Sequence, residues 1–591
     1  GKMPDSLPIW DLTDLYSHDG DDIQRDLEQA ATQTDKLAQY EGRLASLGGA
    51  ELAQIIADYQ AVSERLSRVI SHADLQFAAD MANPKTGQHA QDVKEAISGL
   101  SARLLFIELE LAAMEEDSYQ QALSDHEFYH FVPWLRRLRA YAPHQLESRL
   151  EQMLVERAPA GRGAWVRLFD ETATALRFPL QGGEVTEAEI LNKLSDSSAD
   201  IRKEAGQSLS AVMQDNQRLF SLILNVIAKD KEIDDRWRGF SRPVSSRNLA
   251  NDVDDTTVDA LAEAVTSRMP DIAHRYYQLK AGWMGADSMP WWDRNAPLPG
   301  DDDRRFTWAE ARQIVTEAFT GFDPAMADVA KQFFDRNWID AEVRQGKASG
   351  AFSHPTVPSA HPYILMNFDG RARDVMTLAH EMGHGVHQVL AADQGYLMSD
   401  TPLTLAETAS VFAEMLAFRA LVDKAPTDAA RRFLLAGKIE DMLNTVVRQI
   451  AFHNFETAFH DARKSGEVSG EALSDLWMNT QTQALGPAVR LDDSYRPIWA
   501  YIPHFVHTPF YVYAYAFGDC LVNALWQNYQ EKSAADKLVF SEQYIQLLKA
   551  GGTKRYNEAL APFGLNPADA SFWNMGLDMI AGMIDELESL S

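Results

Sequence analysis

The sequence RDVMTLAHEMGHGVHQVLAADQG, residues 373–395, has the apolar spacing of one amphipathic helix. The residues that would form its packing face are Val375, Leu378, Met382, Val386 and Val389. Gly395 is a typical helix stop. Gly383 and Gly385 each cost about 1 kcal/mol of helix propensity relative to alanine. We therefore expect another backbone or a ligand to approach closely at these two glycines.

This helix carries the pattern His380-Glu381-x-x-His384, which indicates a zinc site. Two histidines four residues apart differ by about 40° around the helix axis, so both imidazoles can reach one metal ion. Glu381 lies beside them, where its carboxylate can take a proton from a water held by the metal. We expect two metal ligands and a general base.

The same pattern occurs a second time, at His126-Glu127-x-x-His130. Ser124-Asp125 resembles a helix N-cap and Pro133 follows closely, so the helix here spans at most about two turns or is kinked. The neighbouring aromatic residues should seek burial, namely Phe128, Tyr129, Phe131 and Trp134. We expect packing or surface histidines here, and one metal ion per chain.

A zinc hydrolase needs a third protein ligand and one open position. Metzincins carry Gly and His where this chain has His387 and Leu390, so that class is excluded. The segment PLTLAETASVFAEMLAFRALVDK predicts a second helix that opens at Pro402 and carries two candidates, Glu407 and Glu414. Small residues around Glu407 favour close approach of two helices, and Glu414 is the competing candidate. His387 is expected to pack or to support a ligand.

A third cluster is YIPHFVHTPFYVYAYAFG, residues 501–518. Its polar aromatic residues are His504, His507, Tyr511, Tyr513 and Tyr515. Their O–H and N–H groups can stabilise negative charge that develops on an oxygen atom beside a metal. Such a run belongs more often to a core, but its occurrence together with a zinc helix favours a functional role.

The composition limits the partners and the surroundings of the chain. Its 591 residues include 55 Lys and Arg against 86 Asp and Glu, a net charge of −31, which argues against nucleic acid or an anionic membrane. One cysteine, Cys520, excludes an internal disulfide framework. No stretch approaches the roughly 18 apolar residues of a membrane span, and the N-terminus lacks a signal-peptide pattern. We expect a cytoplasmic protein.

Helical periodicity dominates the chain, in runs at about 50–115, 185–230, 255–285, 308–335, 400–422, 428–465 and 535–560. Strand signals are few: Trp165–Phe169 with Leu176–Leu180 as one hairpin, and Gly350–Ser353 with Tyr363–Phe368 as a second extended pair. We expect long loops at about 284–304 and 485–498. The predicted division is an N-terminal helical domain, 1–195, and a catalytic domain, 196–591, with parts that can interleave.

Segments along almost the whole chain resemble the oligoendopeptidase F group of the thimet oligopeptidase-like zinc peptidases. They are WDLTDLY (10–16), SRNLANDVDD (246–255), WWDRNAPLP (291–299), WIDAEVRQGKASGAFS (338–353), HPYILMNFDGRARDVMTLAHEMGHGVHQ (361–388), LAETASVFAEM (405–415) and the 501–518 cluster. The resemblance implies a mainly α, clam-like body of many helices. It also implies an internal channel that admits unfolded oligopeptides, with a small β-sheet next to the zinc helix.

The resemblance implies a site as well. It assigns one Zn²⁺ to His380, His384 and Glu407, and the role of general base to Glu381. By position, His507 and Tyr511 resemble the pair that stabilises the carbonyl oxygen of the substrate.

The function expected on these grounds is zinc-dependent hydrolysis of internal bonds in short, unfolded peptides. The free edge of the Tyr363–Phe368 strand would pair with the substrate, and the remaining expected contacts are Phe352, Tyr363, His504, Tyr513 and Tyr515. A dipeptidyl carboxypeptidase or carboxypeptidase on the same scaffold is the alternative, and it would need a basic or tyrosine anchor for a C-terminal carboxylate. A metal-free peptide-binding protein is the alternative from another class.

Overall fold

The computed structural model describes residues 6–590, and it is mainly α, as predicted. The chain divides into two compact units of three segments each. Unit 1 comprises Gly1–Ala142, Asp303–Ala425 and Tyr529–Leu565, and unit 2 comprises Pro143–Asp302, Pro426–Asn528 and Asn566–Ser591. Among the described residues, no helix is both long and apolar enough to cross a membrane. The functional division predicted at residues 195 and 196 stays a prediction.

Unit 1 contains a helical region and the helices around the His380 motif. Its helices are α1 (Asp21–Ala38), α2 (Gly49–Ala79), α3 (Pro84–Ala113), α4 (Glu116–Ala122), α5 (His126–Tyr129), α6 (Val132–Arg139), α15 (Trp308–Phe322), α16 (Pro324–Asp335), α17 (Ala372–Ala391), α18 (Thr408–Asp423), α24 (Ala534–Lys549) and α25 (Tyr556–Leu560). Its strands are β4 (Ile339–Asp340), β5 (Phe352–His354) and β6 (Tyr363–Leu365). On α2, Leu52 and Ile56 are fully buried, and this helix packs against α1, α3 and α5.

Unit 2 is helical as well. Its helices are α7 (Ser148–Arg157), α8 (Arg162–Ala175), α9 (Glu187–Asn192), α10 (Ala199–Asp215), α11 (Gln217–Arg238), α12 (Ser245–Ala250), α13 (Asp255–Arg268), α14 (Arg275–Trp283), α19 (Asp428–Met442), α20 (Arg448–Arg463), α21 (Gly470–Leu485), α22 (His504–His507), α23 (Tyr513–Gln530, up to Asn528 in this unit) and α26 (Ala570–Ser589). Single π turns join α13 to α14 at Pro270–His274 and α19 to α20 at Leu443–Val447. The predicted loops meet where β3 (Met289–Pro290) pairs in parallel with β7 (Val489–Arg490).

Short 3₁₀ segments connect these elements in both units. They are η1 (Leu12–Asp14), η2 (Leu44–Ser46), η3 (Ala142–His144), η4 (Ala158–Ala160), η5 (Lys193–Ser195), η7 (Trp291–Asp293), η8 (Ala392–Gln394), η10 (Asp493–Tyr495), η11 (Ile498–Tyr501) and η12 (Ala561–Phe563).

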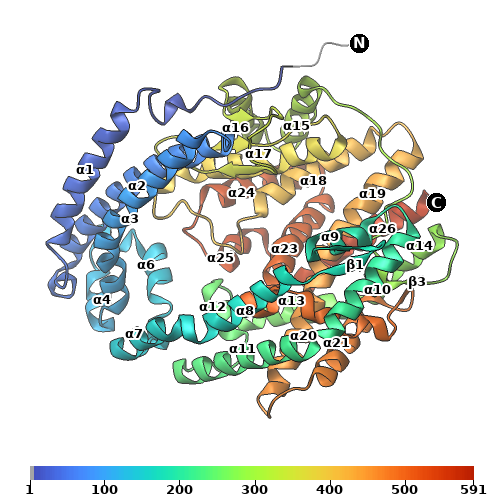
Figure 1. Cartoon of the computed structure of the whole chain (residues 1–591). Coiled ribbons are helices and arrows are strands. Elements are labelled where there is room, and N and C mark those ends of the chain that lie inside the picture. Colours follow the sequence, from blue (N-terminus) through green and yellow to red (C-terminus); the bar gives the residue numbers. More distant parts are fainter. Residues whose placement is uncertain (1–5, 591) are drawn as a thin grey trace. The chain divides into compact units, whose positions relative to one another are not determined.

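The helix α17 contains the His380 motif and lies along α18 (Figure 1). A Cβ atom added at Gly383 would lie 2.5 Å from the carbonyl oxygen of Ala409 in α18. One added at Gly385 would lie 2.6 Å from the ring of Phe333 in α16. The close approach of backbone is therefore confirmed at Gly383, whereas at Gly385 the close neighbour is a side chain, which the prediction did not include.

A three-stranded sheet in the order β4-β6-β5 packs against α17, as the resemblance implied. Its central strand β6 pairs in parallel with β4 and antiparallel with β5. The prediction that the Tyr363–Phe368 strand offers a free edge is wrong, because both of its edges are occupied. The strand β5 has no partner on its other side among the described strands, so it is an edge strand.

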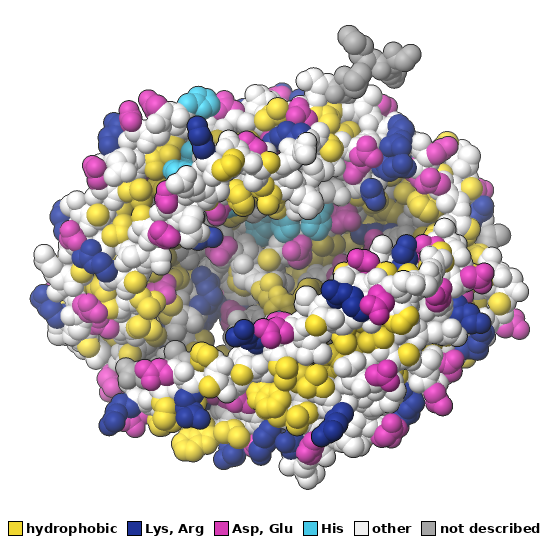
Figure 2. All heavy atoms as spheres, viewed as in Figure 1, with side chains coloured by type: hydrophobic (Ala, Val, Ile, Leu, Met, Phe, Trp, Pro, Cys, Tyr) yellow, Lys and Arg dark blue, Asp and Glu magenta, His cyan; other side chains and the backbone are white. Residues whose placement is uncertain are grey.

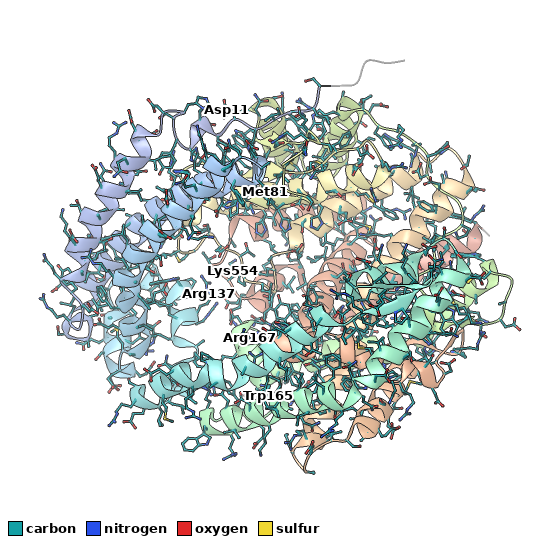
Figure 3. The ribbon with its side chains drawn as sticks, in the orientation of Figure 1. Asp11, Met81, Arg137, Trp165, Arg167 and Lys554 are labelled. Carbon is teal, nitrogen blue, oxygen red and sulfur yellow. The ribbon has the colours of Figure 1, made fainter. Side chains whose placement is uncertain are left out.

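The predicted hairpin Trp165–Phe169 with Leu176–Leu180 is wrong in its first half. Trp165 and Arg167 lie on the helix α8 (Figure 3). The hairpin pairs β1 (Phe178–Leu180) with β2 (Gly183–Val185). Its turn is Gln181-Gly182, where both residues have positive φ, as a two-residue hairpin turn requires. This turn pairs Phe178–Leu180 with the strand that follows it in the sequence, whereas the predicted partner preceded it.

The second helix of the predicted metal site begins later than expected. Turn hydrogen bonds from Leu405 N to Pro402 O and from Ala406 N to Leu403 O precede it, and α18 starts at Thr408. Glu407 is therefore the N-cap residue of α18 rather than a residue of its second turn.

Candidate metal centre and active site

Three side chains of unit 1 converge on one point. Ligand atoms of His380, His384 and Glu407 all lie within 4.8 Å of one another, the one such group of histidine, cysteine and acidic residues found in the described part of the chain. The Glu407 Oε2 atom is 3.6 Å from His380 Nε2 and 3.4 Å from His384 Nε2. These distances exceed those of good hydrogen bonds. They are close to the roughly 3.3 Å between ligand atoms of a tetrahedral site with bonds of about 2.0–2.1 Å.

The carboxylate of Glu414 contacts His380 on the side of its ring that faces away from the other two converging residues. His380 Nδ1 is 2.8 Å from Glu414 Oε2, which leaves Nε2 directed at the convergence point. Metal-bound histidines in proteins almost always have such a partner on their second nitrogen. The geometry thus places Glu407 among the converging atoms and Glu414 behind His380.

Burial and neighbouring charges set the pKa values of the two nearest acids. Burial is the main cause that raises the pKa of the Glu381 carboxyl, which is 8% exposed. For Glu407, burial acts in the same direction, but the neighbouring His384, Ser410 and His380 lower its pKa to about 2. The Ser410 hydroxyl also donates to Glu407 Oε2 at 2.8 Å. Glu407 is therefore a carboxylate at neutral pH.

His387, which follows His384 by three residues on α17, is a buried packing residue, as predicted. It is 4% exposed, and its Nε2 atom is 3.2 Å from the Thr401 hydroxyl. Burial lowers its pKa to about 4, so the imidazole is neutral at pH 7.

The second copy of the motif is a surface feature. The helix α5 is a single turn, capped by the Asp125 carboxylate, which accepts from Glu127 N and Phe128 N. His126 and His130 are exposed, and within residues 6–590 they belong to no group of possible metal ligands. The neighbouring Phe128, Phe131 and Trp134 are buried as predicted, whereas Tyr129 is 60% exposed, contrary to the prediction.

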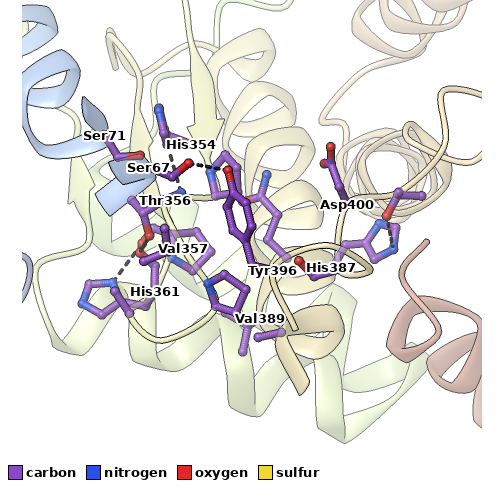
Figure 4. A pocket seen from close by; sticks show the side chains of 18 of the residues that line it. Ser67, Ser71, His354, Thr356, Val357, His361, His387, Val389, Tyr396 and Asp400 are labelled. Carbon is purple, nitrogen blue, oxygen red and sulfur yellow. Dashed lines mark hydrogen bonds between the residues drawn. The ribbon is translucent and has the colours of Figure 1, made fainter. Parts of the chain in front are cut away.

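A cavity of about 820 Å³ in unit 1 reaches His384 (Figure 4). It is lined by α2, by the loop after β5 and by the loop before α18, and its polar groups include His354, Tyr396 and Asp400. The Tyr396 hydroxyl is hydrogen-bonded to Ser67 of α2. A volume in this range is typical of sites for small ligands.

The 501–518 cluster lies in unit 2, on and around α22. His507 is 38% exposed, and its Nε2 atom is 2.5 Å from Asp170 Oδ1 of α8. The rings of Tyr511 and Tyr515 meet edge to face at 5.4 Å. His504 Nε2 is 3.3 Å from the Tyr515 hydroxyl.

Residues far away in the sequence hold the backbone of this cluster. Arg162 donates to the carbonyl oxygens of Val506 and His507, at 3.0 and 2.6 Å. Glu456 of α20 accepts from the amide of Phe510 at 2.9 Å, and Phe510 has the positive φ of 64° that few side chains adopt. Sequence reasoning missed Asp170, Arg162 and Glu456, since no local pattern links them to the cluster.

For two other residues that contact the cluster, the sequence did contain a signal. The segment 246–255, already quoted for its resemblance, contains Arg247 and Asn251. The Arg247 guanidinium lies 5.5 Å from the Tyr511 ring centroid, and Asn251 donates to the Tyr513 hydroxyl at 2.8 Å.

Two of the predicted substrate contacts lie in the core. Tyr363 is fully buried and its hydroxyl donates to the carbonyl oxygen of Asp11. Tyr513 is 1% exposed and is held by Asn251. Their side chains are therefore enclosed by protein, whereas Phe352 on β5 is partly exposed and Tyr515 is 41% exposed.

Known proteins are similar to this chain over most of its length. Residues 193–579 match the family model "Peptidase family M3", and residues 110–178 match "Oligopeptidase F". The chain is 26% identical to the Group B oligopeptidase PepB of Streptococcus agalactiae over 98% of this chain and 96% of the relative. It is 24% identical to the Oligopeptidase PepF of Bacillus subtilis over 100% of this chain and 89% of that protein.

Solved structures show the same fold. One from Chlamydophila abortus has a TM-score of 0.88 at 20% identity, over 99% of this chain and 98% of that one. An oligoendopeptidase F from Enterococcus faecium has a TM-score of 0.67, also at 20% identity, over 96% and 98%. Because the family match covers most of the sequence, the chain belongs to peptidase family M3. It is a peptidase, and within that family it is similar to the oligoendopeptidase F proteins.

Proposed function

We propose that the chain is a zinc-dependent endopeptidase that hydrolyses internal bonds of short, unfolded peptides. The observation that carries this proposal is the convergence of His380, His384 and Glu407 beside the buried Glu381. The names of the relatives, oligopeptidase and oligoendopeptidase, support peptides as the substrate class.

The residues present fit a zinc ion. Two imidazole nitrogens and one carboxylate are the donor set of a common class of catalytic zinc sites, which leaves the fourth position open. The Nε2–Oε2 distances of 3.4 and 3.6 Å suit that set without rearrangement. His380, His384 and Glu407 would hold the ion, with Glu414 fixing the orientation of His380.

In such a site zinc supplies Lewis acidity, which makes water more acidic and polarises a carbonyl group. In the proposed mechanism the Glu381 carboxylate removes a proton from the attacking water and delivers it to the nitrogen of the leaving amine. The raised pKa of Glu381, caused mainly by burial, is consistent with a group that must both accept and release a proton.

His507 and Tyr511 remain the proposed donors to the carbonyl oxygen as it becomes negative. Supporting evidence is the rigidity of their backbone, which Arg162 and Glu456 hold on either side. His504 and Tyr515 are proposed to contact the peptide nearby.

Substrate binding is proposed to use main-chain pairing with β5 in place of β6. An extended peptide could add to this edge strand, which carries Phe352, and could place side chains in the cavity that reaches His384. Main-chain pairing is largely blind to sequence, which suits an enzyme that accepts many peptides.

The test uses a peptide that is blocked at both ends and carries a quenched fluorophore pair. We expect the chain to cleave it at an internal bond, a chelator to abolish cleavage, and one equivalent of Zn²⁺ to restore it. The proposal is overturned if the metal-depleted chain remains active. If only peptides with a free C-terminus are turned over, the carboxypeptidase alternative takes its place.

A further inference from the structure

A second pocket, of about 210 Å³, lies wholly within unit 2. Its walls are aromatic: the rings of Trp291 and Tyr495 are 5.2 Å apart, and those of Phe452 and Trp477 are 5.7 Å apart. The volume is below the roughly 300–1,000 Å³ of pockets for drug-sized ligands, so it suits the end of a chain rather than a whole small molecule.

Two arginines line this aromatic pocket. Arg294 donates to the Asn444 side-chain oxygen at 3.0 Å, and Arg448 donates to the Tyr501 hydroxyl at 2.8 Å. The Arg448 guanidinium also lies 4.8 Å from the centroid of the Phe452 ring. Neither arginine forms an ion pair with any acid of the described residues 6–590. Tyr495 lines the same pocket, and the charges of both arginines oppose the rise in its pKa that burial causes.

This arrangement is unusual for a chain of net charge −31. Acidic and basic side chains are interspersed over the face seen in Figure 2. Two acids near the pocket are paired with other cations, Asp293 with Arg202 at 2.9 Å and Glu440 with Lys280. The charge of Arg294 also acts on Glu440 from beyond ion-pair distance, and Arg448 is only partly buried. A bound carboxylate would give both guanidinium groups a direct anionic partner.

We propose that this pocket binds the free C-terminal carboxylate of a peptide, with the last side chain against the aromatic walls. Arginine is suited to this task because its planar fork of N–H groups matches the two oxygens of a carboxylate. The aromatic walls favour an apolar or aromatic C-terminal residue. The inference rests on the proposed peptidase function and adds to it a determinant of substrate choice.

The position of the pocket supports a peptide as the source of the carboxylate. Arg448 donates to the hydroxyl of Tyr501, which ends η11 three residues before His504. His504 opens α22, which ends at His507. The arginine pocket is thus next to the segment that carries the proposed carbonyl-stabilising groups.

The first experiment needs no variant of the pocket. Two quenched peptides of one sequence, ending in phenylalanine as the free acid or as the amide, are compared on the intact chain. We expect amidation to raise KM about tenfold, the effect of about 1.4 kcal/mol, while kcat changes less than twofold. Equal KM values for the acid and the amide would overturn the inference.

Variants then test whether the two arginines cause this difference in KM. Arg448→Gln should raise KM for the acid to the value for the amide, and Arg448→Lys should keep part of the difference. The matched control is Arg490→Gln, since Arg490 is an exposed arginine of the same unit that hydrogen-bonds Ser288 outside the pocket. A tenfold acid-to-amide ratio that persists in Arg448→Gln and in Arg294→Gln would also overturn the inference.

A binding measurement separates this inference from the proposed function. Calorimetric titration of the Glu381→Gln chain with the two peptides reports the anchor without turnover. The acid should bind about tenfold more tightly than the amide. If the parent chain cleaves peptides but its Glu381→Gln form binds both equally, the anchor is wrong and the function stands. If the acid binds preferentially but the parent cleaves neither peptide, the function is wrong.

Discussion

At the scale of single residues, the proposed base, Glu381, is distinct from the three side chains proposed to hold zinc. Glu381 is not among the converging atoms, so Glu381→Gln should retain zinc while it loses turnover of a quenched peptide by at least about 10³-fold. Zinc content by elemental analysis and the initial rate check this together. Residual activity within tenfold of the parent would show that another group is the base.

If Glu407 is the third zinc ligand, its replacement should weaken zinc binding more than replacement of Glu414. Glu407→Ala should lose most of its zinc on dialysis, because one of three ligand atoms is removed. Glu414→Ala should keep the metal with an affinity about 10–100-fold lower, the usual cost of losing a partner of a ligating histidine. Competition with a zinc chelator measures both affinities. The opposite order would make Glu414 the ligand.

Glu456 behaves differently from these acids because it is completely enclosed. Burial raises its pKa to about 8, although Arg247 of α12 and Lys231 of α11 act in the opposite direction. The histidines on its own helix, His453 and His460, are kept neutral by burial, which lowers their pKa values to about 4 and about 3. At neutral pH the carboxyl group is therefore protonated in the folded chain.

This protonation predicts how stability depends on pH. Between pH 4.5 and 8 the unfolded chain has released the Glu456 proton while the folded chain retains it, so stability falls as pH rises through this window. Glu456→Gln lacks this contribution and keeps an acceptor for the Phe510 amide. The variant should gain thermal stability over the parent from pH 5 to pH 8, as measured by scanning calorimetry. A constant difference across that range would contradict the raised pKa.

At the scale of elements, the contact of α17 with α18 decides where Glu407 lies. Gly383→Ala places a methyl group 2.5 Å from the Ala409 carbonyl oxygen, so the helices must separate. We expect a loss of about 1–3 kcal/mol in stability, together with weaker zinc binding. The control is Gly321→Ala in α15, where a Cβ meets nothing within 4 Å and the change should be neutral or slightly stabilising. Unaltered zinc affinity in Gly383→Ala would show that this contact does not position Glu407.

At the scale of the whole molecule, we expect only one of the two copies of the His-Glu-x-x-His pattern to bind metal. We expect one zinc ion per chain, because His126 and His130 are exposed on a single turn without a third ligand in the described structure. The double change His126→Ala with His130→Ala should leave zinc content and activity unaltered. The double change His380→Ala with His384→Ala should remove both. Two zinc ions per parent chain would contradict this reading of the duplicated motif.

Features that depend on local spacing were predictable from the sequence. The helix α17, its apolar face and the crowded glycines follow from residues within a few turns of one another. The single-turn helix at His126 follows from Asp125 and Pro133 in the same way. Turn geometry was harder, because the positive φ angles at Gln181 and Gly182 moved the hairpin beyond its predicted place.

The sequence by itself indicated the helical class, the two histidines able to hold a metal and two candidate acids, because motif spacing and periodicity are local properties. The family was indicated by the resemblance of segments along the chain. Only the tertiary structure decided the roles that depend on neighbours distant in the chain. It placed β6 between two strands, put Glu414 behind His380, and joined Asp170 to His507 across 337 residues. It also brought Arg294 and Arg448 to one aromatic pocket. Such pairings arise when separate helices pack, so no sequence pattern records them.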